Sequence, residues 1–215
     1  PAYLERLVEA VSGHEKIQVL TEALVVGFSG YKGNFSTEVL VGPGMYQRRI
    51  EHGVAIVATG AREYQPREFH YGDDRRIMTQ LELERFMAFR AQEVSRWQRV
   101  VMIQCVGSRN AENPNCSRIC CQTAVKNALL LKERNPCLEI LVLYRDMRTY
   151  GLLEDYYTTA RSEGILFCRY EAEHPPEVRL DGDDLNLSFV DHVLGRPVKV
   201  KADAVVLSAA TVAED

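Results

Sequence analysis

Four of the six cysteines in this chain lie between Cys105 and Cys121. Their spacing is C-x10-C-x3-C-C, at Cys105, Cys116, Cys120 and Cys121, and the segment contains no histidine. Four thiolates without a histidine are typical ligands of a [4Fe–4S] cluster. The spacing therefore predicts an iron–sulfur site on these four residues.

Three other interpretations of these cysteines stay open. Zinc usually takes paired ligands with two to four residues between them, and adjacent Cys120 and Cys121 would crowd one tetrahedral ion. Thiol–disulfide exchange has less support, because the chain has no C-x-x-C and a vicinal disulfide is strained. Four buried cysteines that act as small hydrophobes are the alternative without chemistry. Cys137 and Cys168 fall in strand-like runs, where we expect core packing.

A strand and the start of a helix must bring the four thiols together. Cys105 closes an expected strand at 100–104, and the other three cysteines lie on the turn into an expected helix at 121–134. Because Cys121 lies about 100° around a helix from Cys120, the thiols converge only if the helix starts at or after Cys120. The amides and the dipole of a helix N-terminus would then lower the pKa of the thiols.

Side chains near the cysteines are expected to support this arrangement. Asn115 and Ser117 are candidate caps for the helix, since short polar side chains accept hydrogen bonds from the first amides. Arg109 and Arg118 would offset the negative charge of a thiolate-bound cluster.

The second half of the chain alternates between strand and helix patterns. A capping box, Thr79-Gln-Leu-Glu82, opens a helix. Strands expected at 100–104, 138–144 and 165–170 then alternate with helices at 121–134 and 153–163. This order predicts an α/β fold with a Rossmann-like parallel sheet. Hairpin-like strands are expected at 178–180, 185–193 and 198–200, before a final apolar strand at 204–208.

The first half predicts a helix followed by a small antiparallel β meander. Strand patterns occur at 17–20, 23–28, 37–41, 46–50 and 54–58, separated by turns that contain glycine. The run Val54–Ala58 is apolar on both faces and predicts a buried strand. We expect one domain at 1–65, a linker at 66–78 and a second domain at 79–203, with residues 204–215 as a strand that returns to the first domain.

Composition excludes several classes of protein. The 215 residues carry 26 basic and 30 acidic side chains, a net charge of −4 with the signs interspersed, which argues against a nucleic-acid partner. No apolar run approaches the roughly 18–20 residues that cross a bilayer. The missing initiator Met and the lack of a signal-peptide pattern predict a piece of a longer chain. Clustered cysteines favour a reducing compartment, the cytoplasm.

Longer motifs give the chain a family resemblance. It resembles the HdrA family, the iron–sulfur flavoprotein subunits of heterodisulfide reductases, together with their relative in the quinone-interacting oxidoreductase complex of sulfate reducers. The resemblance rests on Ile103-Gln-Cys-Val-Gly-Ser-Arg109, Cys116-Ser-Arg-Ile-Cys-Cys121, Lys126-Asn127-Ala128 and Leu143-Tyr-Arg-Asp-Met-Arg-Thr-Tyr-Gly151. It covers nearly the whole chain, more weakly before Val54 and after Glu171.

The resemblance implies a fold of the pyridine-nucleotide-disulfide-oxidoreductase type, in which an FAD domain is interrupted by a nicotinamide-type domain. It implies that the four cysteines bind a [4Fe–4S] cluster near the flavin, and that Ala58, Thr59 and Gly60 form a turn close to FAD, where glycine lets the backbone approach. The FAD domain is incomplete here, because no G-x-G-x-x-G loop occurs in the sequence. The turn after strand 100–104 holds only Gly107, so we expect no NADH or NADPH binding. Arg145, Asp146 and Arg148 are expected to form a solvated turn.

The function implied by the resemblance is that of an oxidoreductase. In the intact protein FAD would exchange electrons with the cluster, which would pass them to other subunits of a heterodisulfide-reductase-like complex. The piece alone is expected to be inactive and free of flavin, and a homodimer is an assembly to test. Two alternatives are an NAD(P)H-dependent flavin disulfide reductase and a non-catalytic domain that docks partner subunits.

Overall fold

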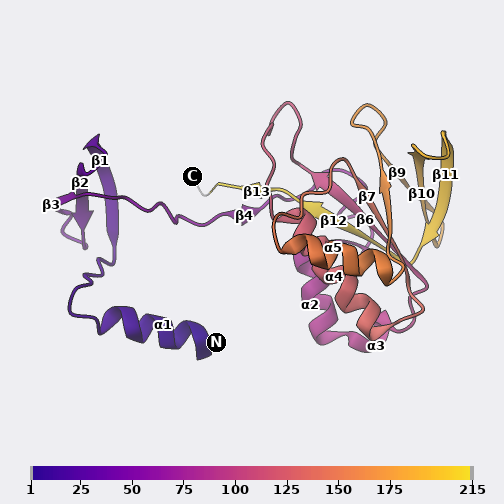
Figure 1. Cartoon of the computed structure of the whole chain (residues 1–215), viewed down its shortest axis with the longest axis horizontal. Helices are drawn as coiled ribbons and strands as arrows, with labels where there is room; N and C mark the ends of the chain where they lie inside the picture. Colours follow the sequence, from indigo (N-terminus) through magenta and orange to yellow (C-terminus); the bar gives the residue numbers. More distant parts are fainter. Residues whose placement is uncertain (1, 214–215) are drawn as a thin grey trace. The chain divides into compact units, whose positions relative to one another are not determined.

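The computed structural model describes residues 2–213 and divides into two compact units, Pro1–Thr59 and Gly60–Asp215. In Figure 1 the first unit runs from indigo to purple, and the second continues through magenta and orange to yellow. All six cysteines lie in the second unit.

The first unit contains helix α1 (Ala2–Ser12) and a three-stranded antiparallel sheet. Its strands are β1 (Ala23–Tyr31), β2 (Asn34–Val41) and β3 (Tyr46–His52), paired in that order. The predicted meander is therefore confirmed for the patterns at 23–28, 37–41 and 46–50.

The strands predicted at 17–20 and 54–58 are wrong, because both segments are irregular. A strand needs a neighbouring strand to pair its backbone N–H and C=O groups, and in residues 2–213 neither segment has one. Val54, Ile56 and Val57 are accordingly 74 %, 88 % and 83 % exposed.

A five-stranded parallel sheet forms the centre of the second unit, which confirms the predicted Rossmann-like α/β fold. Cores of Val, Ile and Leu on both faces explain why its strands are apolar throughout. The strand order is β5 (Ile77–Thr79), β12 (Ala204–Ala209), β6 (Arg99–Val106), β7 (Glu139–Tyr144) and β8 (Leu166–Arg169).

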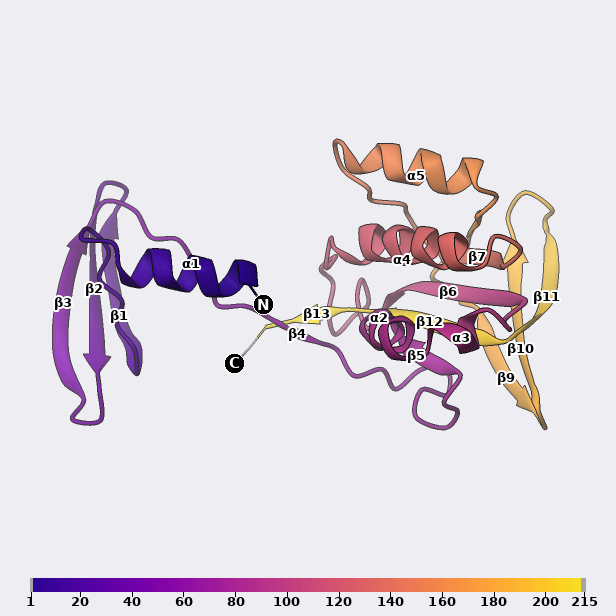
Figure 2. The same cartoon turned by 90° about the horizontal axis from the view of Figure 1, so that it is seen from below.

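Helices cover one face of this sheet and a second, antiparallel sheet covers the other (Figure 2). Alternate residues of β6 divide between the two cores: Val100 and Met102 pack with the helices, and Ile103 packs with the antiparallel sheet. The helices are α2 (Gln80–Phe89), α3 (Ala91–Val94), α4 (Cys120–Arg134) and α5 (Leu153–Ser162). The antiparallel strands are β9 (Glu177–Asp181), β10 (Asp184–Asp191) and β11 (Arg196–Ala202).

The capping box predicted at the start of α2 is confirmed. The backbone N–H of Glu82 donates to Thr79 Oγ1 at 3.2 Å, and the backbone N–H of Thr79 donates to Glu82 Oε2 at 2.8 Å. Thr79 Oγ1 also donates to Glu63 Oε2 at 2.9 Å. The helix start is thereby tied to the strand that holds Glu63.

The domain limits differ from those expected. The division falls between Thr59 and Gly60, and the expected linker at 66–78 belongs to the second unit and ends in β5. Short strand β4 (Arg62–Glu63) pairs with β13 (Thr211–Val212), so the chain from residue 62 onward is already anchored. The expected return strand at 204–215 lies instead inside the parallel sheet as β12, because its residues are buried on both faces.

Within residues 2–213, no helix is long and apolar enough to span a membrane.

Candidate metal centre

Strand β6 and the start of α4 supply the four cysteines. Cys105 lies near the end of β6, Cys116 lies in the following loop, and Cys120 and Cys121 are the first two residues of α4. The helix therefore begins where convergence of the thiols requires it to begin. The charges of Cys105, Cys116 and Cys121 all act on Cys120 and raise the pKa of its thiol, so the structure brings these four groups into one electrostatic neighbourhood.

The loop between Cys105 and Cys116 folds back on the end of β6. Cys105 and Arg109 have φ angles of 64° and 56°, in the left-handed region that few non-glycine residues adopt. The backbone N–H of Arg109 donates to the carbonyl of Asn115 at 3.3 Å, and Asn113 Nδ2 donates to the carbonyl of Gly107 at 3.1 Å. Such strained conformations cluster at functional sites and are held by their surroundings, here by these loop contacts.

Each thiol at the start of α4 donates to a backbone carbonyl. Cys120 Sγ donates to the carbonyl of Ala209 at 3.6 Å, and Cys121 Sγ donates to that of Asp146 at 3.7 Å. Cys116 Sγ instead accepts from the backbone N–H of Arg118 at 3.4 Å. A thiolate has no proton to donate, so the first two contacts belong to the metal-free protein and break when a metal binds.

The expected caps of α4 are wrong. The helix begins after Ile119, whose side chain makes no capping hydrogen bond, and the first turn contains no acidic residue. Ser117 Oγ accepts instead from the backbone N–H of Thr211 at 2.9 Å, which ties the loop to β13. The first amides of α4 are thus left without a side-chain acceptor, next to sulfur atoms that become anionic when they ligate a metal.

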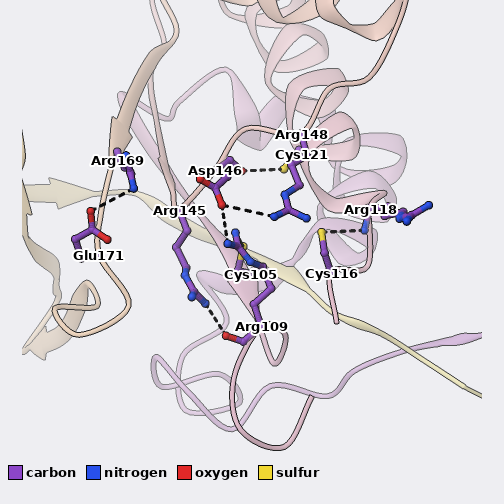
Figure 3. Close-up of polar contacts among 10 residues, drawn as sticks. All are labelled: Cys105, Arg109, Cys116, Arg118, Cys121, Arg145, Asp146, Arg148, Arg169 and Glu171. Carbon is purple, nitrogen blue, oxygen red and sulfur yellow. Dashed lines mark hydrogen bonds and ion pairs between the residues drawn. The ribbon is translucent and has the colours of Figure 1, made fainter. Parts of the chain in front are cut away.

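Asp146 lies among the arginines around the cysteines (Figure 3). Its Oδ2 accepts from Arg109 Nη2 at 2.6 Å and lies 3.7 Å from Arg148 Nη2. Arg109 Nη1 in turn approaches Cys105 Sγ at 4.0 Å, and Arg145 Nη1 donates to the carbonyl of Arg109 at 2.9 Å. The solvated turn expected at residues 145–148 is therefore wrong.

The sequence contains one signal that could have found Asp146. It follows β7, the strand next to β6 in the sheet. Since carboxyl ends of neighbouring parallel strands meet at one edge, the residues after β7 must lie close to those after β6, where Cys105 stands.

Burial dominates the acid–base behaviour of three of the thiols. It raises the pKa of Cys105 and Cys121, and it raises the pKa of Cys120 to about 11. Hydrogen bonding from Arg109 opposes the effect at Cys105. Buried thiols that stay protonated are poor nucleophiles, so the geometry gives no support to thiol–disulfide exchange, and none of the six cysteines forms a disulfide.

The donor set fits a metal cluster better than a single ion. Among residues 2–213, no three His, Cys, Asp or Glu side chains are grouped so that they could hold one ion. A [4Fe–4S] cube binds each thiolate through a different iron, so its ligands stand farther apart than those of one ion. The surroundings are cationic, with Arg109, Arg145 and Arg148, and suit anionic ligands. The buried amide of Gln104, next to Cys105, has no hydrogen-bond partner in this part of the chain.

The turn after β6 offers little room for a dinucleotide. Gly107 has a φ of 70°, and a Cβ on it would lie 2.2 Å from the ring of Tyr64. The close approach that glycine permits is therefore taken by an aromatic side chain of the protein itself.

The residues expected near FAD lie apart from the cysteines along the chain. Ala58, Thr59 and Gly60 are exposed, lie outside any strand and span the boundary between the two units. The strand expected to position them, at 54–58, is irregular. Their place beside a flavin stays a prediction for the longer protein.

The remaining cysteines divide between two environments. Cys137 is exposed, so its expected core packing is wrong. Cys168 is half-buried in β8, and its thiol lies 3.2 Å from Asp191 Oδ2. Burial, followed by the Asp191 carboxylate, raises the pKa of Cys168 to about 12.

Comparisons with known proteins show where this arrangement has relatives. The iron–sulfur subunit HdrA of the CoB–CoM heterodisulfide reductase of Methanocaldococcus jannaschii is 37 % identical over 179 residues, which are 75 % of this chain and 27 % of that protein. The corresponding subunit of the H(2)/formate:CoB-CoM heterodisulfide,ferredoxin reductase of Methanococcus maripaludis is 36 % identical over 178 residues, 74 % of this chain and 27 % of that protein. The chain thus spans about a quarter of the length of these curated relatives.

A solved structure with a similar fold is DfoA bound to FAD, a cadaverine monooxygenase from Erwinia amylovora. It matches with a TM-score of 0.51 and 8 % identity, over 100 % of this chain and 57 % of that one. At this identity the likeness concerns the fold alone. No family model matches the chain.

Proposed function

The chain is a homologue of part of HdrA, the iron–sulfur subunit of heterodisulfide reductase, and we propose on that premise that it is an oxidoreductase module which holds one [4Fe–4S] cluster. Cys105, Cys116, Cys120 and Cys121 are the proposed ligands. A cluster bound there supplies one-electron transfer. The name of the Methanocaldococcus jannaschii relative, which calls it an iron–sulfur protein, supports this assignment.

One observation carries the proposal. Four thiols from a strand end, a loop and a helix start share one neighbourhood beside the free amides of α4, with arginines on the adjacent loop and on the turn after β7. The protein's part is to lower the cost of anionic sulfur: the helix dipole and the guanidinium groups favour thiolates over thiols. The carbonyls of Ala209 and Asp146 hold the protons of Cys120 and Cys121 until metal replaces them.

The longer protein is proposed to combine this module with a flavin. In that protein, FAD would exchange single electrons with the cluster, and partner subunits would receive or supply them. The relatives are named as single subunits of their enzymes, which supports an assembly with other subunits and lends nothing to a homodimer. Ala58, Thr59 and Gly60 are the proposed flavin-proximal turn in that context.

A nicotinamide-dependent reductase has less support. The turn after β6, where a dinucleotide would place its pyrophosphate, has a single glycine, which is covered by Tyr64. The cysteine loop takes the remaining place between β6 and α4.

Anaerobic reconstitution of the chain with ferrous iron and sulfide tests the proposal. We expect about four irons and four sulfides per chain, a brown chromophore and, after reduction, an EPR signal of a [4Fe–4S] cluster. Cys120→Ser or Cys121→Ser should sharply lower the iron content. Cys137→Ser, at an exposed position, is the matched control and should leave the iron content unchanged.

Two outcomes contradict the proposal. One is stoichiometric zinc with no chromophore, which would assign the thiols to a single ion. The other is iron content that survives replacement of each of the four cysteines by serine, which would place the cluster elsewhere or show adventitious binding.

A further inference from the structure

Asp146 holds a cationic donor against one of the proposed ligands. Its carboxylate binds Arg109 Nη2 at 2.6 Å, while Arg109 Nη1 points toward Cys105 Sγ at 4.0 Å (Figure 3). One guanidinium group therefore spans the distance between a carboxylate and a sulfur. The planar fork of arginine is suited to such a bridge, because its N–H donors keep fixed directions.

Arg109 is fixed at its backbone as well. Its N–H donates to the carbonyl of Asn115 at 3.3 Å, and its own carbonyl accepts from Arg145 Nη1 at 2.9 Å. The side chain of Arg109 is 18 % exposed, which limits screening by water. Both ends of this residue are thus held in place beside Cys105.

From these contacts we infer that Arg109 stabilises the reduced form of the cluster by donating a charge-assisted hydrogen bond to Cys105 Sγ, and that Asp146 is the residue that positions Arg109 for this. This inference rests on the proposed function, since it concerns a cluster bound at Cys105. Reduction adds one electron to the cluster, and no protein bond forms or breaks. The added negative charge spreads over the ligating sulfurs, so a cationic donor on one of them favours the reduced state.

The first test is the reduction potential of the reconstituted chain, titrated anaerobically with dithionite and followed by visible absorption and EPR. Arg109→Ala should lower the potential, with about a tenfold change in the one-electron equilibrium constant, equivalent to about 59 mV. Arg118→Gln is the matched control, because Arg118 belongs to the same segment but its side chain is exposed and has no side-chain contact to a cysteine described in residues 2–213. An equal shift in both variants would overturn the inference, since it would reflect lost charge alone.

A double-mutant cycle isolates the positioning role of Asp146. Asp146→Asn removes a negative charge, which by itself raises the potential, and it also releases Arg109, which lowers it. In the Arg109→Ala background only the charge effect remains. We therefore expect Asp146→Asn to raise the potential more in that background than in the wild-type chain. Equal shifts in the two backgrounds would show that Asp146 does not position Arg109.

A second measurement needs no cluster. In the NMR spectrum of the metal-free chain, the guanidinium N–H signals of Arg109, identified by their loss in Arg109→Lys, should be resolved and slow to exchange with water. Asp146→Asn should collapse them. Persistence of these signals in Asp146→Asn would overturn the positioning role.

The two levels of failure are distinguishable. A wild-type chain that assembles no cluster overturns the proposed function, and the tuning of the cluster with it. A chain that assembles the cluster but keeps its potential in Arg109→Ala overturns only this inference.

Discussion

The ring of Tyr64 packs on the backbone of Gly107, at the turn where β6 leads into the cysteine loop. Tyr64 is held there by its own backbone, whose N–H donates to the carbonyl of Ala210 at 2.8 Å. A side chain at residue 107 would meet the ring at 2.2 Å and would also have to adopt a φ of 70°. The direction of the chain between Cys105 and Cys116 thus depends on this one contact.

Gly107→Ala should destabilise the second unit by about 2–4 kcal/mol. The left-handed backbone costs an alanine about 1–2 kcal/mol, and overpacking against the ring adds about 1–3 kcal/mol. Urea unfolding followed by the fluorescence of Trp97, the single tryptophan, measures the change in this unit.

Two comparisons separate the backbone cost from the steric cost. Gly151→Ala is the control, because Gly151 has a φ of 58° and an added Cβ would meet nothing within 4 Å. Tyr64→Ala combined with Gly107→Ala should recover part of the loss relative to what the two single changes would give together. Equal losses in Gly107→Ala and Gly151→Ala would contradict the role of Tyr64.

The chain should bind neither NADH nor NADPH with micromolar affinity. A pyrophosphate site needs a tight turn and a close backbone approach, which the G-x-G-x-x-G loop provides with separate glycines. Here the turn after β6 has one glycine, and Tyr64 covers it. Calorimetric titration of each nucleotide into the chain is the measurement, and micromolar binding of either one would refute the prediction.

The local elements around the site could be predicted from the sequence, but their neighbours could not. The capping box at Thr79 and Glu82 and the start of α4 at Cys120 depend on residues close together in the chain, and both predictions are confirmed. The bridge from Asp146 to Arg109 depends on β7 lying beside β6. Because the order of strands in a parallel sheet is not written in any single strand, the turn after β7 looked like an ordinary solvated turn.

The same reason explains the misplaced strands. Val205 and Val206 in β12 are buried between β5 and β6, although their apolar pattern fits any buried strand equally well. The pattern at Val54–Ala58 is just as apolar, yet within residues 2–213 it pairs with no strand. An apolar run predicts that a strand is suited to burial, whereas the neighbour that buries it must come from elsewhere in the fold.

Cys168 should react far more slowly with iodoacetamide than exposed Cys137 at pH 8. Its thiol donates to Asp191 Oδ2 at 3.2 Å, and burial together with this carboxylate raises the pKa of Cys168 to about 12. Only the thiolate is alkylated, so the rate at Cys168 should rise about tenfold per pH unit between pH 7 and 9. Mass spectrometry of the alkylated peptides gives both rates.

The raised pKa of Cys168 also has a sign for stability. The unfolded chain releases its thiol proton first, so the contribution is complete below the ordinary thiol pKa and is lost as pH rises toward 12. Asp191→Asn removes the carboxylate charge and should speed alkylation of Cys168. Equal rates for Cys168 and Cys137 at pH 8 would contradict this environment.

The last prediction concerns flavin: the 215-residue chain should purify without it, although the longer protein is proposed to bind FAD. No G-x-G-x-x-G loop occurs in the sequence, so no helix start of that type offers amides and dipole to the anionic pyrophosphate. Each missing charge-assisted hydrogen bond costs roughly 1.5–3 kcal/mol, and the loss of several weakens binding by orders of magnitude. Ala58, Thr59 and Gly60 are exposed and irregular, and cannot replace that loop. Absorption spectra of the chain after gel filtration are the measurement, made before and after incubation with FAD. A yellow protein with stoichiometric flavin bands would show that this chain builds a flavin site without the loop.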